Sequence, residues 1–369
     1  MMITSIEVFG YDLHYADGAY VMSADRVVTQ LSSTVVKLVT DAGIIGWGEV
    51  CPLGPAYLPS FAEGARAAVK ELAPALLGLD PRNVGLVNER MDSVLRGHGY
   101  AKSPIDTACW DVLGKATGLP VSMLLGGQRQ ESYPLYIAVP LRSADEMADY
   151  VVAKRAAGVH RFQLKIGGDP YADRDRVERV LAVTGPEDIV IADANGAWNL
   201  QEAMVAARLL DPLPRVYLEQ PCRTLEECVY VRQHTTLPMI LDEIITDPNS
   251  LLRAFRAGAM EAINLKISKV GGLTRAKLMR DLAEDLGLRL TIEDTWGGDL
   301  VTAAISHLAG STRAKTLFTV SFMNDWVKEH IAGYQPRSRN GVGFVPTGPG
   351  LGVEVEPVHL GGPLFTFVR

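Results

Sequence analysis

The first third of the chain alternates apolar and polar residues as β-strands do, and then changes to the spacing of helices. Strands are predicted over Ile3–Leu13, Thr34–Thr40 and Ile44–Val50, with a turn at Asp41-Ala-Gly between the last two. Apolar residues then recur three and four positions apart, which is typical of amphipathic helices. Three helices are predicted, and the last begins with a Ser-Pro capping pattern: Ser60–Leu77, Pro81–Leu95 and Ser103–Gly118. A sheet followed by helices indicates an α+β region.

From about Ser132 the pattern changes, and short apolar runs alternate with helical segments. The predicted strands are Tyr133–Val139, Arg161–Ile166, Ile189–Asp193, Val216–Glu219, Met239–Asp242, Ala262–Lys266, Leu288–Asp294 and Thr316–Phe322. The predicted helices between them are 145–157, 172–183, 200–210, 225–233, 248–258, 273–286 and 300–308. Eight strands repeating roughly every 25 residues are typical of a closed (β/α)8 barrel. The alternative, an open doubly wound sheet, would need a glycine-rich turn after its first strand, and Val139–Arg142 has none.

We therefore expect an α/β protein that consists of a (β/α)8-type barrel and an α+β capping domain. Residues 1–128 would form the capping domain, and residues 129–330 would form the barrel with the chemically active groups. The segment 331–369 would return to the capping domain, because Gly341–Arg369 is again rich in glycine, proline and strand-like sequence.

Composition excludes several classes of function. The formal net charge of −7 and the lack of a basic cluster argue against a nucleic-acid partner. No run of about 18 apolar residues exists, so no membrane partner is expected. The N-terminal residues lack the basic and apolar regions of a signal peptide, and the four cysteines form no disulfide framework. These features favour a cytoplasmic protein with reduced thiols.

Ionisable side chains end six consecutive predicted strands of the barrel. In chain order they are Lys165, Asp193, Glu219, Asp242, Lys266 and Asp294. A barrel of this type carries its active site at the carboxyl ends of its strands, so these side chains should meet at one mouth. One such charge is commonly only solvated, but six in succession point to a site.

Three of these groups suggest a metal. Asp193, Glu219 and Asp242 end adjacent strands, and three carboxylates in a partly dry pocket would repel one another unless a cation lay between them. Oxygen ligands alone favour a hard ion, so we expect Mg2+. Asn195 and Glu243 are expected to orient the ligands from behind.

The two lysines suggest proton transfer. Lys165 and Lys266 end the second and sixth strands, which lie on opposite sides of an eight-stranded barrel, so they should face each other across the cation. A nearby cation disfavours the charged form of a lysine and lowers its pKa, which makes the lysine a competent base. The cation would stabilise the charge formed when a carbon next to a carboxylate loses its proton.

With these residues the chain resembles the enolase superfamily, in the mandelate racemase/muconate lactonizing enzyme group. The resemblance covers essentially the whole chain and rests on DANGAW, LEQP, LDE and KISKVGG in this order, together with the C-terminal GPGLGV. It implies that Asp193, Glu219 and Asp242 bind the metal and that Lys165 and Lys266 form the acid/base pair. The group usually has Lys-x-Lys at the end of the second strand, whereas this chain has Gln163 at the first position. Gln163 is expected to bond to substrate or to a metal ligand.

The expected substrate is a small carboxylate with a cationic nitrogen. Tyr57 in the loop Cys51–Ser60, together with Trp296 and Phe322 at the barrel mouth, could surround such a nitrogen by cation–π attraction. The segment Tyr15–Asp25 is a second candidate specificity loop. Asp294 is a candidate for a hydrogen bond to the substrate or to Lys266.

Local stretches narrow the expected reaction. GWGEVCPLGPAYLPS, GHGYAKSPIDTACWDVLGK and EDTWGGDL are similar to segments of proline-betaine 2-epimerases and cis-3-hydroxy-L-proline dehydratases. We expect 2-epimerisation of proline betaine or a hydroxyproline betaine by two lysines. The alternative is dehydration of cis-3-hydroxy-L-proline by syn elimination, in which one lysine serves as base and then as acid.

Three further interpretations stay open. The chain could be a racemase of another amino acid derivative or a barrel protein without catalytic activity. A homo-oligomer is compatible with the sequence but not indicated by it. His98 and His307 are not assigned to the site, because a predicted capping-domain turn and a helix favour structural roles for them.

Overall fold

A computed structural model describes residues 1–23 and 26–369. Its central feature is an eight-stranded parallel sheet in sequential order from β7 to β14. The bounds are Ile137–Val139 (β7), Arg161–Lys165 (β8), Ile189–Asp193 (β9), Val216–Glu219 (β10), Met239–Leu241 (β11), Ala262–Lys266 (β12), Arg289–Glu293 (β13) and Leu317–Val320 (β14). The first and last strands meet where the Tyr136 N–H donates to the Val320 carbonyl at 2.9 Å. The fold is therefore a (β/α)8-type barrel, as expected.

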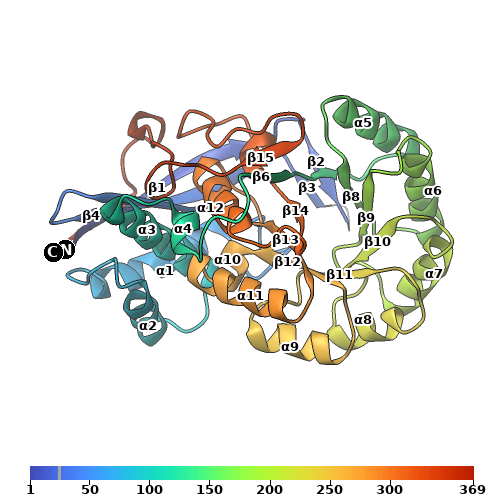
Figure 1. Ribbon diagram of the computed structural model, residues 1–369, viewed down its shortest axis with the longest axis horizontal. Coiled ribbons are helices and arrows are strands. Elements are labelled where there is room, and N and C mark those ends of the chain that lie inside the picture. Colours follow the sequence, from blue (N-terminus) through green and yellow to red (C-terminus); the bar gives the residue numbers. More distant parts are fainter. Residues whose placement is uncertain (24–25) are drawn as a thin grey trace.

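Helices cover the outside of the barrel between successive strands (Figure 1). They are Ala144–Ala156 (α5), Pro170–Leu181 (α6), Leu200–Leu210 (α7), Leu225–Arg232 (α8), Pro248–Arg256 (α9), Leu273–Asp285 (α11) and Asp299–Gly310 (α12). Several start at a polar N-cap whose side chain accepts a bond from the first turn, as at Ser143, Asn199 and Thr224. A short helix, Ile267–Val270 (α10), follows β12 and was not predicted.

The residues packed inside the barrel show which side chains of each strand point inward. Ile191, Ile240, Ala262 and Phe318 pack together as a separate apolar cluster, with Tyr217 against it. Because side chains alternate between the two faces of a strand, residues two positions further along point inward as well. This alternation carries Asp193, Glu219 and Asp242 to the carboxyl end of the barrel interior.

The capping domain is built on a four-stranded antiparallel sheet with the order β16-β1-β4-β5. Its strands are Ile3–His14 (β1), Gln30–Thr40 (β4), Ile45–Val50 (β5) and Phe365–Val368 (β16). The helices are Ala62–Leu72 (α1), Val84–Val94 (α2), Gly99–Thr117 (α3) and Val121–Leu124 (α4), with a 3-10 turn at Ala73–Ala75 (η1). Pairing of β16 with β1 brings the two termini together at one end of the molecule (Figure 1).

The cap sheet and α3 lie unusually close together. A Cβ added to Gly48 would lie 2.0 Å from the Pro104 carbonyl oxygen, and one added to Gly46 would lie 2.2 Å from that of Ala108. The two glycines of the GWGE motif therefore let β5 lie directly on α3.

Three sequence predictions need correction. The run Tyr133–Val139 is two strands, because Ser132–Pro134 (β6) pairs antiparallel with Val342–Phe344 (β15) and only β7 enters the barrel. Helix α3 begins at Gly99 rather than Ser103, because the left-handed backbone of His98 (φ 53°) starts it and Pro104 lies inside it.

The third correction concerns the segment predicted as a specificity loop. A hairpin of Tyr20–Met22 (β2) and Arg26–Val28 (β3) was not anticipated there. The last two positions of Tyr15–Asp25 lie outside the described residues.

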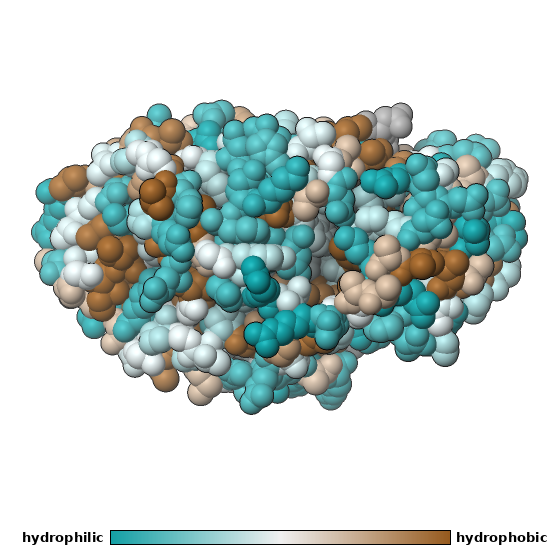
Figure 2. Space-filling view, turned by 90° about the horizontal axis from the view of Figure 1, so that it is seen from above, coloured by the Kyte–Doolittle hydropathy of each residue, from teal (hydrophilic) through white to brown (hydrophobic). Residues whose placement is uncertain are grey.

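The chain ends with short irregular turns, a 3-10 turn at Met323–Trp326 (η2) after β14 and another at Pro357–His359 (η3). Among the described residues, no helix is long and apolar enough to cross a bilayer. Polar and apolar side chains are interspersed over the face shown in Figure 2.

Candidate active site

The strand register brings the predicted site residues to one level at the carboxyl end of the barrel. Asp193 on β9 is in register with Lys165 on β8 and with Glu219 on β10. On the other side, Lys266 on β12 is in register with Glu293 on β13. Asp242 directly follows β11 between these two groups. The five predicted metal and acid/base residues are all buried.

Asp193 is held by Lys165 and Asn195. The Lys165 ammonium donates to Asp193 Oδ2 at 2.5 Å, and the Asn195 amide donates to the same oxygen at 2.9 Å. The Asn195 backbone N–H bonds the other Asp193 oxygen, and its amide also reaches Glu243 Oε1 at 3.1 Å. Asn195 and Glu243 thus lie behind Asp193, where orienting groups were expected.

Glu219 is held by amides alone. The Gln163 amide donates to both of its oxygens, at 2.9 and 3.0 Å, and the Asn264 amide donates to Oε1 at 2.7 Å. Gln163, the departure from Lys-x-Lys, therefore bonds a predicted metal ligand. A neutral amide at this position holds the carboxylate without adding a positive charge.

Asp242 gathers several donors from different parts of the chain. Lys266 donates to its Oδ2, and Lys269 lies 2.8 Å from its Oδ1. The Tyr57 hydroxyl, from the capping loop, lies 2.8 Å both from Asp242 Oδ2 and from the Lys266 ammonium. Lys269, which the sequence left unassigned, thus belongs to the site.

The buried charges influence one another strongly. Burial, reinforced by Asp193 and Asp242, raises the pKa of Glu219 well above its ordinary value. For Lys165, burial alone would lower the pKa, but the acidic groups around it, with Asp193 foremost, together outweigh burial and raise the pKa. Burial would likewise lower the pKa of Lys266, but the nearby carboxylates, first Asp242 and then Glu293, raise it. The lowered lysine pKa values expected from the sequence would require a cation to replace the lysines as partners of these carboxylates.

The donor chemistry fits a hard divalent cation. Asp193, Glu219 and Asp242 supply carboxylate oxygens from adjacent strands, each oriented by bonds from neighbouring side chains. Lys165 pairs with Asp193, and Lys266 pairs with Asp242. A cation between the carboxylates would neutralise their charge in place of the lysines. The residues therefore suit the Mg2+ site expected from the sequence.

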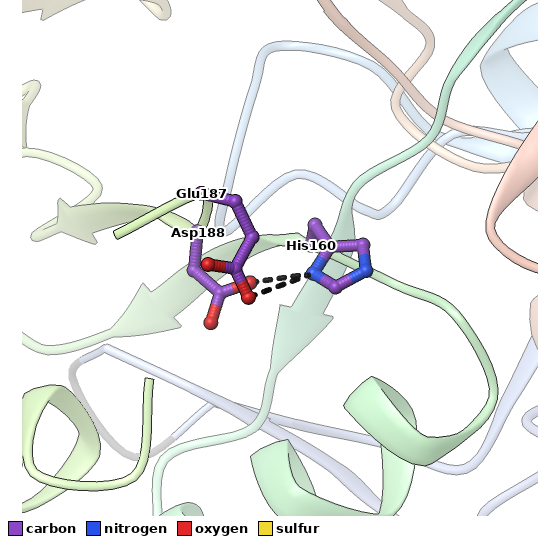
Figure 3. A group of neighbouring side chains, drawn as sticks. All are labelled: His160, Glu187 and Asp188. Atoms are coloured by element: carbon purple, nitrogen blue, oxygen red, sulfur yellow. Dashed lines mark hydrogen bonds and ion pairs between the residues drawn. The ribbon is translucent and has the colours of Figure 1, made fainter. Parts of the chain in front are cut away.

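A second cluster of metal-binding residue types lies at the other end of the barrel strands (Figure 3). Within residues 1–23 and 26–369, His160, Glu187 and Asp188 form the one group whose ligand atoms all lie within 4.8 Å of one another. Arg155 already pairs with both carboxylates, at 3.0 and 2.7 Å. Because this guanidinium supplies the positive charge, the cluster is an ion-pair network and a poorer candidate for a metal.

A small chamber of about 20 Å³ is lined by both lysines. Aromatic side chains form much of its wall: Tyr20, Tyr57, Tyr136, Trp296 and Trp326. A larger cleft of about 550 Å³ opens on the side of Asn195 and Glu243, and Tyr57 lines both spaces. Tyr57 thus separates the chamber from the outer cleft.

Two of the residues predicted to contact the substrate have other partners in the structure. Phe322 does not line the chamber, because its ring is buried against Tyr133 and would meet any side chain at Gly343. Asp294 lines the chamber, but its carboxylate accepts bonds from the Ser268 hydroxyl and N–H and from the Thr295 N–H. Burial raises the pKa of Asp294 to about 6.

Glu293 is the acidic side chain that the sequence interpretation missed on this strand. It is in register with Lys266, its Oε1 lies 3.1 Å from that ammonium, and its Oε2 accepts a bond from Tyr136. The alternation of β13 gives only a partial signal: it places Thr291 and Glu293 on one face, but which face points inward depends on the pairing of β13 with β12. Tyr136, Asn264 and Trp326 carried no comparable signal.

Comparisons with known proteins agree with this geometry. The family model described as "Mandelate racemase / muconate lactonizing enzyme, N-terminal domain" matches residues 9–126, and "Enolase C-terminal domain-like" matches residues 146–358. The chain belongs to the mandelate racemase/muconate lactonizing enzyme family. This assignment places it in the enolase superfamily, as the sequence motifs suggested.

Relatives of this family member include enzymes of more than one reaction type. It is 49% identical to a cis-3-hydroxy-L-proline dehydratase of Roseibium aggregatum over 99% of both chains. It is 28% identical to an N-succinyl-L-Arg/Lys racemase of Bacillus cereus over 86% of both. A mandelate racemase/muconate lactonizing enzyme of Roseovarius nubinhibens, described as putative and complexed with magnesium, has a TM-score of 0.95 and 34% identity over both complete chains.

Proposed function

We propose that this protein dehydrates cis-3-hydroxy-L-proline. The observation that carries the proposal is the pair of buried ammonium groups, Lys165 and Lys266, which lie on strands four apart in the eight-stranded ring and both line the chamber. The dehydratase relative, at 49% identity over nearly the whole chain, supports this reaction over the epimerisation expected first from the sequence. The racemase relative is more distant.

The stereochemistry of this substrate suits two opposed lysines. In the cis isomer the carboxylate and the 3-hydroxyl share one face of the ring, so the C2 hydrogen and the hydroxyl lie on opposite faces. Loss of water therefore follows an anti course, and the syn course with a single lysine does not apply to this substrate. One lysine removes the C2 proton, and its opposite donates a proton to the departing hydroxyl.

The bonds balance without any further reactant. The C2–H bond breaks, its electron pair forms the C2–C3 double bond, and the C3–O bond breaks with release of water. The product is a ring enamine that tautomerises to a cyclic imine. Both lysines regain their starting protonation states by one exchange with solvent.

Asp193, Glu219 and Asp242 would hold a divalent cation next to the two lysines, which pair with two of these carboxylates. When bound, the cation supplies neutralisation of the charge that develops on the substrate carboxylate as C2 loses its proton. Gln163 and Asn264 keep Glu219 in place, and Tyr57 excludes water from the side of the outer cleft.

One observation favours 2-epimerisation of proline betaine as the second candidate. Tyr20, Trp296 and Trp326 line the chamber, and their rings contact one another at centroid distances of 5.3 to 6.4 Å. Such a wall attracts a quaternary nitrogen by cation–π interaction. The same two lysines would exchange the C2 proton between faces.

Incubating the Mg2+-treated protein in D2O with each compound separates the candidates. We expect cis-3-hydroxy-L-proline to lose one water, seen by mass spectrometry and by a new ultraviolet absorbance. L-Proline betaine should show neither water loss nor inversion. Deuterium entry and inversion at C2 of the betaine, with no reaction of the hydroxyproline, would replace the proposal by epimerisation.

A further inference from the structure

Glu293 carries a buried carboxylate oxygen that lacks a hydrogen-bond donor. The residue ends β13, lines the chamber and is 2% exposed. Its Oε2 accepts a bond from the Tyr136 hydroxyl, but among the described residues no group donates a hydrogen bond to Oε1. A buried acceptor of this kind is costly unless a ligand satisfies it.

Lys266 does not fill this role. Its ammonium lies 3.1 Å from Glu293 Oε1, which is an ion-pair distance, but its hydrogen bonds go to Asp242 and to the Tyr57 hydroxyl. Glu293 therefore offers a free acceptor, and it lines the chamber in which the substrate ring would lie.

The rest of this part of the chamber is aromatic. The centres of the Tyr20 and Trp296 rings lie 5.3 Å apart in an edge-to-face arrangement, and Trp326 lies 5.6 Å from Trp296 and 5.9 Å from Tyr136. Such walls stabilise any cation, whether or not it carries N–H groups. A carboxylate acceptor distinguishes the two kinds, because a hydrogen bond to an ammonium requires an N–H.

We propose that Glu293 binds the ring ammonium of the substrate and thereby selects secondary amines over N,N-dimethylated ones. The proposal rests on the proposed function for the position of the substrate, but it concerns binding rather than chemistry. Glu293 would accept one N–H of the ring nitrogen, while the aromatic wall covers the carbon atoms next to it. A ring without nitrogen would leave the carboxylate unpaired.

L-Proline and L-proline betaine make a matched pair of probes, because they share the ring and the carboxylate and differ in the N-methyl groups. Neither can lose water, so their binding is independent of whether the protein is a dehydratase. Affinity can be measured with Mg2+ present, by calorimetry or by the fluorescence of Trp296 and Trp326. We expect wild-type protein to bind L-proline at least about tenfold more tightly than the betaine.

The variant Glu293→Gln tests the residue itself. It should weaken L-proline binding by about tenfold or more and change betaine binding by less than about threefold. Equal losses for both ligands would assign Glu293 to positioning Lys266 and overturn the proposal, as would no loss for either. Glu187→Gln, at the other end of the barrel, is the matched control and should leave both affinities unchanged.

Wild-type protein alone keeps the proposal testable if Glu293→Gln fails to fold. Cyclopentanecarboxylate, which lacks the nitrogen, should bind more weakly than L-proline. Betaine or cyclopentanecarboxylate binding as tightly as L-proline would overturn the role of Glu293, whatever reaction the protein catalyses.

Discussion

The hydroxyl of Tyr57 lies 2.8 Å from Asp242 Oδ2, although 185 positions separate the two residues in the chain. This bond joins a loop of the capping domain to a predicted metal ligand of the barrel. The Arg26 guanidinium lies 5.7 Å from the centre of the Tyr57 ring and donates to the Ala56 carbonyl at 3.0 Å. The cap therefore reaches into the site and completes its wall.

Tyr57→Phe should reduce kcat/KM by about tenfold or more, because two hydrogen bonds to charged groups are lost at the mouth of the chamber. The loss should appear mainly in KM, because the lysines and carboxylates remain. Steady-state kinetics with cis-3-hydroxy-L-proline measures it. Tyr230→Phe on the exposed face of α8 is the matched control. Unchanged kinetics in Tyr57→Phe would show that the hydroxyl is dispensable.

Lys165→Ala and Lys266→Ala should each lower the dehydration rate by at least about a hundredfold, because each removes a proton-transfer group. The two variants should differ in D2O. The variant that lacks the base should neither exchange the C2 hydrogen nor release water. The variant that lacks the acid should still exchange it. If both variants exchanged the C2 hydrogen to the same extent, the result would argue against one lysine acting as base and the other as acid on opposite faces of the substrate ring.

Removal of divalent cations should abolish activity, and return of Mg2+ should restore it. Mg2+ at about a hundred times its dissociation constant should stabilise the folded protein by about 2.7 kcal/mol. Thermal unfolding with and without Mg2+ measures this effect. Asp242→Asn should lose the stabilisation, whereas Glu187→Gln in the His160 cluster should retain it. The reverse pattern would place the cation at the other end of the barrel.

Gly298→Ala should destabilise the protein by about 1–3 kcal/mol, because the added Cβ overpacks a junction between the domains. That atom would lie 2.2 Å from the Tyr11 hydroxyl and 3.1 Å from Glu49 Oε1. Glu49 accepts bonds there from both Tyr11 and the Gly298 N–H. Urea unfolding provides the measurement. Gly85→Ala, where a Cβ meets nothing within 4 Å, is the control, and equal stabilities would contradict the packing argument.

His307 should make stability depend on pH below neutrality. Burial lowers its pKa to about 4, and the ring accepts a bond from the Ser122 N–H at 3.2 Å while its other nitrogen bonds the Leu351 carbonyl. Between pH 6.5 and 4 the unfolded chain binds the proton and the folded chain does not. The contribution of the neutral His307 ring to the free energy of unfolding is therefore complete above pH 6.5 and is lost as pH falls toward 4.

The expected loss between pH 7 and pH 4.5 is about 2 kcal/mol. Urea unfolding at the two pH values measures it. In His307→Gln the side chain offers one acceptor and one donor but does not titrate. The loss of unfolding free energy between the two pH values should therefore be smaller in this variant than in wild-type protein by about the same amount. A wild-type protein and variant with the same pH dependence would mean that His307 is not the responsible group.

The sequence determined most of the architecture by itself. The periods of the apolar positions are local properties, and they located the barrel strands within one or two residues, except at β7. The positions of Lys165, Asp193, Glu219 and Lys266 followed from the ends of those strands. The ends of parallel strands meet at one rim of a barrel whatever the details of packing.

Only the tertiary structure decided which neighbour of a strand end points inward. The alternation of β13 turns Glu293 into the chamber, while the Asp294 carboxylate turns to Ser268. One position along a strand reverses the direction of a side chain, and the register is fixed by pairing with β12 rather than by local sequence.

Contacts between the domains were also beyond the sequence. Tyr57 was a candidate from its loop, but its bond to Asp242 depends on how the cap lies on the barrel. Phe322 looked equivalent in sequence and packs instead behind the barrel wall on Tyr133. Periodicity specifies elements because it acts over a few residues. The chemistry of the chamber depends on side chains that only long-range packing brings within hydrogen-bonding distance.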